Sequence, residues 1–367
     1  FGAPSAMSQK RPMTILDLIA VPSVSDPQLS PDGRHVVYVK SEAEWAENRT
    51  ISHVFLVNAD GSGTRQLTFG KEGQSSPRWS PDGRYIAFLA RRGDQESTQI
   101  HLLPMEGGEA RPLTSHETSV GSISWSPGGA YLYFLADDPR TEEELRKEEA
   151  GDDVYAFDEE YRQTHLWNVD VETGEESRMT EGDFTVGSYT ISRDGTRVAH
   201  MRAPSPLYGE VQHSEVWLMG ADGSSALQLT SDTVPQGGPE LSPDGRWVLF
   251  TADSNEELDF YYNDKIFLVP SGGGEARVLL PDFSGSISGA TWSEDGSGVF
   301  FAASVGVRRE LFRADVPSGM LTRLTQGDHA VGSADFDPDL GLVAFTLQSQ
   351  QSPGDVWLME TGTGAEP

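Results

Sequence analysis

The stretch Ser80-Pro81-Asp82-Gly83-Arg84-Tyr85-Ile86-Ala87-Phe88, preceded by Trp79, decides the fold of this chain. Pro-Asp-Gly is turn chemistry, because proline presets φ, aspartate bonds back to the backbone and glycine takes positive φ at little cost. The aromatic and β-branched residues beside the turn are typical of strands. The stretch is therefore predicted to form a strand, a tight corner and a second strand.

The same corner recurs along the whole chain, each time ahead of an apolar strand. Seven copies begin at Ser30, Ser80, Ser126, Ser192, Ser242, Ser293 and, in degenerate form, Asp337. A second marker, usually Leu-Thr, stands ahead of the later corners at Leu67, Leu113, Met179, Leu229, Leu279 and Leu324. Its second residue precedes the next corner by 12 residues in five cases and by 13 in the sixth. Constant linkage between repeats of varying internal length is typical of stacked supersecondary units.

Each repeat also contains a further apolar strand between its corner and the next marker, such as Val54–Val57 or Val216–Met219. Four short strands at a period of about 50 residues are the signature of a propeller blade. We therefore predict an all-β fold, a seven-bladed β-propeller of four-stranded antiparallel blades with a short N-terminal helix. A linear solenoid of hairpins is the alternative, although four-strand periods rarely stack linearly.

The composition limits the partners of the chain. The formal net charge is −30, and no basic stripe suited to nucleic acid is visible, so we expect no nucleic-acid partner. No run of 18 apolar residues exists, so we expect no membrane span. The absence of cysteine excludes thiol catalysis and leaves the cytoplasm and the periplasm equally open. The excess of carboxylates suits either a salt-adapted source or an ordinary acidic, soluble protein.

Residues 1–25 are predicted to form an N-terminal arm with a short helix, and residues 26–367 the propeller. Thr14 and Asp17 resemble a helix N-cap pair. The residues that would share one apolar face of the helix are Ile15, Leu18 and Ile19. A helix this short is not stable alone in water. Its apolar face is therefore expected to pack either on the rim of the propeller or on a partner domain.

The third repeat carries the longest insertion, residues 137–163, with a charged, helix-forming middle at Thr141–Glu149. Long excursions from a propeller rim often carry function. The candidate substrate-binding residues at the end of this insertion are Glu159, Glu160, Tyr161 and Arg162. Paired carboxylates bind an ammonium group more strongly in a sheltered cavity than in water. The alternative is a solvated, charged loop.

No catalytic or metal-binding motif is found. The chain has neither a Gly-x-Ser-x-Gly nucleophile elbow nor a His-Glu-x-x-His pair, and we predict no cofactor. The Asp335-x-Asp337-x-Asp339 run looks like a calcium loop, but Leu340 displaces the glycine and Thr346 stands where a bidentate glutamate is needed. This run is more simply the seventh corner.

The repeats are similar to those of Tol-system periplasmic propellers, and two further features narrow the resemblance. The segment Thr14–Leu18, leading to the first corner, resembles the start of prolyl oligopeptidase-family proteins. The insertion with Asp152-Asp153, which ends in His165–Asp170, resembles the acylaminoacyl-peptidase and dipeptidyl-peptidase-like branches of that family. The resemblance covers essentially the whole chain, and it rests on the arrangement of these segments along the chain more than on one motif.

This resemblance implies a propeller that precedes an α/β-hydrolase domain, covers its active site and admits short peptides. The chain carries no catalytic triad, so it is predicted to be non-catalytic alone, with the hydrolase domain as its partner. In dipeptidyl peptidases a glutamate pair from the propeller binds the free amine, and Glu159-Glu160 resemble it as a pair. The alternative function is that of a stand-alone Tol-type binding propeller without enzymatic activity. Both functions are compatible with an oligomer of the chain.

The last repeat stops where an Arg-x-Leu-Thr strand is expected, so the seventh blade is predicted to lack its fourth strand. We therefore expect the natural polypeptide to continue past Pro367, with that strand and then the hydrolase domain, or the segment to arrive as a separate, cleaved chain. Pro22 and Pro27 make the N-terminal segment a poor strand donor for closing the ring.

Overall fold

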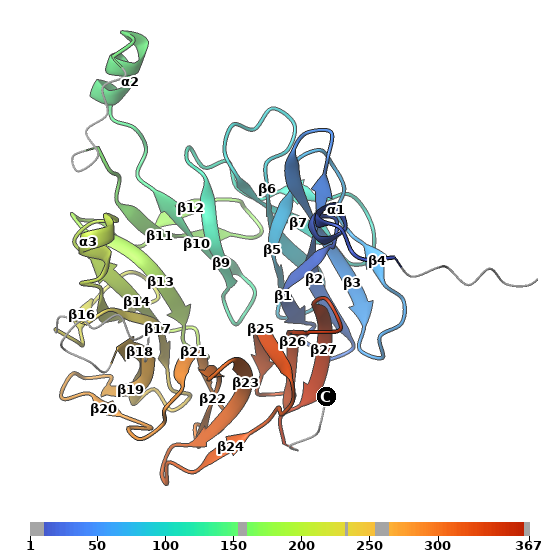
Figure 1. The fold of residues 1–367 in the computed structure, drawn as a ribbon. Coiled ribbons are helices and arrows are strands. Elements are labelled where there is room, and N and C mark those ends of the chain that lie inside the picture. The colour runs from blue at the N-terminus through green and yellow to red at the C-terminus, as the bar shows by residue number, and fades with distance from the viewer. Residues whose placement is uncertain (1–10, 153–159, 232–233, 254–263, 363–367) are drawn as a thin grey trace, which may run out of the picture.

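The computed structural model describes residues 11–152, 160–231, 234–253 and 264–362 of the chain. These residues form antiparallel sheets arranged in a ring, with the first strands of successive sheets on the inside (Figure 1). The start of the chain meets its end in this ring, because β1 packs against β25 and β26. The predicted all-β fold is therefore confirmed.

Five sheets have four strands each, and the remaining one has seven. The first two four-stranded sheets contain β1 (Ser23–Leu29), β2 (His35–Glu44), β3 (Arg49–Asn58) and β4 (Arg65–Gln66), then β5 (Gln74–Trp79), β6 (Tyr85–Ala90), β7 (Gln99–Pro104) and β8 (Arg111–Pro112). The third contains β9 (Val120–Trp125), β10 (Tyr131–Asp137), β11 (Thr164–Asp170) and β12 (Glu176–Arg178). The fourth and fifth contain β13 (Thr185–Ile191), β14 (Arg197–Ala203), β15 (Glu215–Gly220) and β16 (Leu227–Gln228), then β17 (Gln236–Leu241), β18 (Trp247–Asp253), β19 (Asp264–Pro270) and β20 (Arg277–Val278).

The last two repeats share one sheet. Its strands are β21 (Ser286–Trp292), β22 (Gly298–Val305), β23 (Arg308–Asp315), β24 (Leu321–Arg323), β25 (His329–Asp337), β26 (Leu342–Ser349) and β27 (Asp355–Glu360). A single parallel pair, Arg309 with Ala330, joins β23 to β25. The predicted four-stranded antiparallel unit is thus confirmed in five separate sheets, whereas the sixth and seventh repeats are continuous with each other.

Every predicted corner joins the first two strands of its repeat, and local hydrogen bonds explain its sequence. In the first corner, Ser30 Oγ donates to Asp32 Oδ1 (2.7 Å) and accepts from the backbone N–H of His35 (2.9 Å). The aspartate also accepts from the N–H that follows the glycine. Gly33 has a φ of 68°, which a residue with a side chain rarely adopts. The same bonds recur at Ser80, Ser192, Ser242 and Ser293.

The threonine of the second marker completes the outer edge of each repeat. Thr68 Oγ1 accepts a hydrogen bond from the N–H of Val54, fourteen residues earlier. Four further pairs repeat this bond at the same separation: Thr114 with Ile100, Thr180 with Leu166, Thr230 with Val216 and Thr325 with Leu311. These hydroxyls satisfy buried N–H groups of the third strand where the short fourth strand ends, which explains why threonine recurs there.

The innermost strands carry a bulge that the sequence did not reveal. The register shifts between Ser25 and Gln28 in β1, and corresponding shifts occur in β5, β9, β13, β17, β21 and β25. Residues in the left-handed region at these bulges are Asp26, Ser76, Ser122, Gly238 and Gly289. Pro27 lies inside β1 at such a bulge, where no ladder N–H is needed. Because β1 pairs with β2 and not with β27, the expectation that Pro22 and Pro27 make the segment a poor donor of the strand missing from the last repeat stays a prediction, and β1 begins at Ser23, within the predicted arm.

The hydrophobic core lies between neighbouring sheets. One cluster joins Leu249 and Leu268 of the fifth sheet to Trp292, Phe301 and Phe312 of the next, all nearly inaccessible to solvent. Equivalent clusters fill the other inter-sheet spaces. Each sheet is thus stabilised mainly by its two neighbours, as in other radial repeats.

The described residues contain three helices besides the strands: α1 (Ile15–Ile19), α2 (Glu142–Glu149) and α3 (Tyr208–Val211). The predicted N-cap is confirmed, because Thr14 and Asp17 form a reciprocal capping box at the start of α1. The predicted charged helix is confirmed as α2. Among the described helices, none is both long and apolar enough to cross a membrane.

Candidate functional site

The antiparallel order of the strands gives the ring two faces of different construction. Connections between the first and second strands, and between the third and fourth, end at one face, which we call the corner face. Connections between the second and third strands, and between one repeat and the next, end at the opposite face, which we call the insertion face. All three helices belong to the insertion face, since α1 precedes β1, α2 lies between β10 and β11, and α3 lies between β14 and β15.

Exposed large hydrophobic side chains are concentrated on the insertion face. They occur along Met13–Val21, in the hairpin turns at Trp45, Val305 and Val307, in the connection at Phe69, and on the insertions at Leu145, Tyr161, Tyr208 and Val211. Only scattered examples, such as Leu340 and Trp357, belong to the corner face or the outer strands. Exposed apolar side chains gathered on one face are typical of an interaction site, so the insertion face is the candidate for one.

Helix α1 presents its apolar residues to solvent. Ile15, Leu18 and Ile19 are 76%, 63% and 52% exposed, so the predicted apolar face does not pack on the described part of the propeller. A cavity of about 650 Å³ lies beside the helix, between β1 on one side and β25 and β26 on the other. Leu18 and Val21 line its edge, together with Gly332 and Leu347. The helix and this cavity form one apolar patch over the junction of the first and last repeats.

The structure places the predicted substrate-binding residues at the end of the long insertion. Glu160 is exposed, and Tyr161 is 37% exposed. Arg162 Nε lies 3.9 Å from a carboxylate oxygen of Glu144 on α2. Glu159 lies outside the described residues. The role of this group in substrate binding stays a prediction.

Buried polar contacts fix the root of this insertion to two sheets. The Gln163 amide donates to Asp183 Oδ1 and to the carbonyl oxygen of Pro204, both at 3.0 Å. Asp138 pairs with Arg178 at 2.8 Å. His165, which is inaccessible to solvent, lies 3.6 Å from Asp138, and burial lowers its pKa. The insertion therefore rises from a rigid base.

A second cavity, of about 380 Å³, opens beside this base, between the third and fourth sheets. Small residues such as Gly121, Ser122 and Gly187 form its floor, and Val211 of α3 forms part of its wall. Asp137 contributes a carboxylate, held by the Thr164 hydroxyl at 2.6 Å. The cavity can therefore accept a small cationic group. Sequence reasoning missed it, because its lining comes from six separate segments of the chain.

Charged and polar groups of the innermost strands contact the innermost strands of neighbouring repeats. Arg78 Nη1 lies 3.0 Å from both carboxylate oxygens of Asp26, and Asp335 accepts from the N–H of Leu29 at 2.9 Å. Burial raises the pKa of Asp335 to about 6 and that of Glu240 to about 7. Both carboxyls keep some accessible surface, so they face an enclosed, polar axis. Within the described ranges, no three histidine or acidic residues converge as a metal site would require.

These features define a β-propeller, and comparisons with known proteins agree on this fold. A family model described as the lipoprotein LpqB β-propeller domain matches residues 55–231. Among solved structures, the β-propeller domain of the Trilobed protease from Pyrococcus furiosus aligns with a TM-score of 0.65 at 17% identity, over 93% of this chain and 96% of that one. The Pyrococcus horikoshii acylaminoacyl peptidase aligns with a TM-score of 0.69 at 18% identity, over 93% of this chain and 51% of that one.

Two of the sequence relatives are named as peptidases. Dipeptidyl-peptidase 5 of Porphyromonas gingivalis is 24% identical over 93% of this chain and 53% of its own length. The uncharacterized peptidase YuxL of Bacillus subtilis is 27% identical over 68% of this chain and 32% of its own length. The chain thus spans about half or less of these relatives. It is homologous to the propellers of such peptidases, which confirms the resemblance to the prolyl oligopeptidase family.

Proposed function

We propose that this chain is the seven-bladed propeller part of a serine peptidase that cleaves short peptides near their N-terminus. The observation that carries the proposal is the concentration of exposed apolar side chains on the insertion face, in a chain whose relatives are peptidases of about twice its length. In this proposal β21–β24 and β25–β27 count as the sixth and seventh blades, the last one without its fourth strand. An α/β-hydrolase domain, in the same polypeptide or as a cleaved chain, covers the insertion face and supplies the catalytic residues.

The propeller then acts as a gate and as a holder of the substrate. The rigid ring restricts access to short peptides, and the insertion of residues 137–163 projects toward the hydrolase. Glu159 and Glu160 bind the free amine of the peptide, with Tyr161 and Arg162 beside them. Charge-assisted hydrogen bonds of this kind are about twice as strong as neutral ones, and a covered site strengthens them further.

The test uses the complete gene product and a chromogenic dipeptide substrate with a free amine. The Glu159→Gln/Glu160→Gln variant is expected to have a lower kcat/KM. The decrease corresponds to a loss of roughly 2–4 kcal/mol in transition-state binding. A Glu142→Gln/Glu143→Gln variant, which changes two glutamates on α2, is the matched control and is expected to keep full activity. Equal kcat/KM in the first variant and the parent would remove the glutamate pair from the site.

The purified chain alone is expected to hydrolyse no peptide or ester, because it carries no nucleophile elbow. Turnover that survives removal of contaminants would contradict this. The alternative, a stand-alone binding propeller, is distinguished by the intact mass of the protein from its native source. A mass no larger than that of this chain, with no tightly bound hydrolase, would favour the alternative.

A further inference from the structure

At three intervals of the corner face, the glycine of one corner packs against the proline of the preceding corner, and the interval between the first and second corners lacks this contact. A methyl group on Gly129, Gly195 or Gly296 would lie 3.5–3.6 Å from the proline ring of the preceding corner, as expected for close packing. At Gly83, the same position would meet nothing within 4 Å. The first and second corners are therefore separated where these three pairs of corners touch.

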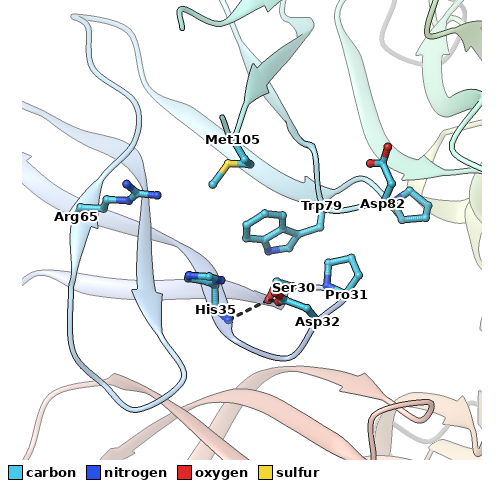
Figure 2. A pocket seen from close by; sticks show the side chains of 10 residues that line it. Ser30, Pro31, Asp32, His35, Arg65, Trp79, Asp82 and Met105 are labelled. Carbon is cyan, nitrogen blue, oxygen red and sulfur yellow. Dashed lines mark hydrogen bonds between the residues drawn. The ribbon is translucent and has the colours of Figure 1, made fainter. Parts of the chain in front are cut away.

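A cavity of about 390 Å³ fills this interval. Trp79 lies at its centre, with Met105 above the indole and His35 below it in the view of Figure 2. The Trp79 indole N–H donates to the carbonyl oxygen of Gln28 at 3.3 Å, which fixes the orientation of the ring. The ring centroids of His35 and Trp79 are 6.4 Å apart. These side chains offer a preformed apolar surface large enough for one aliphatic or aromatic group.

On one side of this surface lies a guanidinium group that makes no hydrogen bond or ion pair within the described part of the chain. Arg65 lines the cavity and points toward it in Figure 2, and it has no hydrogen bond or ion pair with any other residue that the structure describes. Arg111, the equivalent residue of the next sheet, instead donates to the carbonyl oxygen of Val171 at 3.3 Å. Arg65 is thus free to bind a carboxylate from a ligand.

Carboxylates lie on the other side of the cavity. Asp32 and Asp82 come from the two separated corners, and Figure 2 places Asp82 across the indole from Arg65. Hydrogen bonds from Ser30 and Ser80 lower the pKa values of these two aspartates, so both stay ionised at neutral pH. Asp82 also pairs with Arg84 at 3.2 Å and Asp32 lies 3.9 Å from Arg34, and both pairs are exposed to solvent, where ion pairs contribute little. The cavity therefore has groups of opposite charge at the two ends of an apolar surface, which is complementary to a zwitterion.

We propose that this corner-face cavity binds a free amino acid or dipeptide with an apolar side chain. Arg65 takes its carboxylate, Asp32 and Asp82 take its ammonium group, and Trp79 and Met105 cover its side chain. The net charge of −30 favours this class over simple anions, because a strongly acidic protein repels free anions whereas a zwitterion carries no net charge. The proposal concerns the face opposite the insertions and is independent of any peptidase activity.

Isothermal titration calorimetry of the purified chain with leucyl-leucine tests this site. Two derivatives of the ligand separate its ends: N-acetyl-leucyl-leucine lacks the ammonium group, and leucyl-leucinamide lacks the carboxylate. The Kd of each derivative is expected to be about tenfold or more higher than that of the parent dipeptide, because a hydrogen bond to a charged group is lost at one end. Equal affinity of all three ligands, or no binding of the parent, would overturn the proposal.

The protein side of the test uses a matched pair of variants. Arg65→Gln is expected to weaken leucyl-leucine by about tenfold and to leave leucyl-leucinamide unchanged, because only the carboxylate contact is removed. Arg111→Gln changes the equivalent residue outside the cavity and is expected to bind like the parent. Circular dichroism spectra establish that both variants are folded. Unchanged binding in the folded Arg65→Gln variant would place the ligand elsewhere.

Discussion

Replacing Thr325 by valine tests how much the buried network of the sixth repeat stabilises the chain. Thr325 is 1% exposed, and its hydroxyl accepts from the N–H of Leu311 at 3.0 Å and donates to Glu310 at 2.5 Å. Glu310 is inaccessible to solvent and also contacts Arg323 at 2.6 Å and His329 at 3.0 Å. Valine keeps the shape of threonine but removes both hydrogen bonds.

The expected cost has two parts. An unsatisfied buried N–H costs about 1–3 kcal/mol, and a lost hydrogen bond to a charged group costs about 1.5–3 kcal/mol. Because Glu310 keeps its contacts with Arg323 and His329, the lower half of each range applies, and Thr325→Val is expected to cost about 3 kcal/mol. Thr68→Val is the matched control. Thr68 accepts from the N–H of Val54 and has no carboxylate partner, so it is expected to cost about 1–2 kcal/mol.

Urea unfolding of the two variants and the parent, followed by circular dichroism, measures both free energies of unfolding. The difference between the two free energies of unfolding reports the contact with Glu310, because each variant loses the equivalent backbone hydrogen bond, from Leu311 or from Val54. Equal destabilisation would show that the hydroxyl contributes nothing to holding the buried carboxylate, and the reasoning would fail.

Three further outcomes are expected. Replacing Ile15, Leu18 and Ile19 together by serine should change the free energy of unfolding of this chain by less than about 0.5 kcal/mol, because these side chains are already exposed; a larger loss in urea would place α1 in the propeller core. Burial raises the pKa of Glu240 from 4.5 to about 7. The contribution of this residue to stability should therefore decrease as the pH rises from about 4.5 through 7. A Glu240→Gln variant should show a flatter pH profile of the melting temperature. Gly289→Val should cost about 1–2 kcal/mol in urea unfolding because φ there is 60°; an unchanged stability would show that the bulge relaxes.

The sequence predicted those parts of the fold that depend on local chemistry. The corner at Ser30 and the cap at Thr14 are recognisable because each is closed by hydrogen bonds within five residues. The Leu-Thr marker was visible through its spacing, although the reason for it, a bond to the third strand, required the structure.

The parts that were missed depend on contacts between repeats. Asp26 adopts a left-handed conformation and pairs with Arg78, which lies 52 residues away. No local pattern distinguishes this aspartate from those in the corners. The cavity at Trp79 depends on the distance between two corners, which is set by packing around the whole ring. Pro27 fits within β1 because a bulge removes the need for its N–H.

The contrast between the two faces explains where new binding functions can arise on this chain. On the corner face, the hydroxyl and carboxylate of each corner are used to hold the turn, as at Ser242 and Asp244, so a substitution there costs stability. On the insertion face, hairpins such as the one at Trp45 extend away from the core, so their sequence can change without disturbing the sheets. A large partner therefore suits the insertion face, whereas a small ligand suits the corner face at the interval beside Gly83, where packing leaves the Arg65 guanidinium without a partner among the described residues.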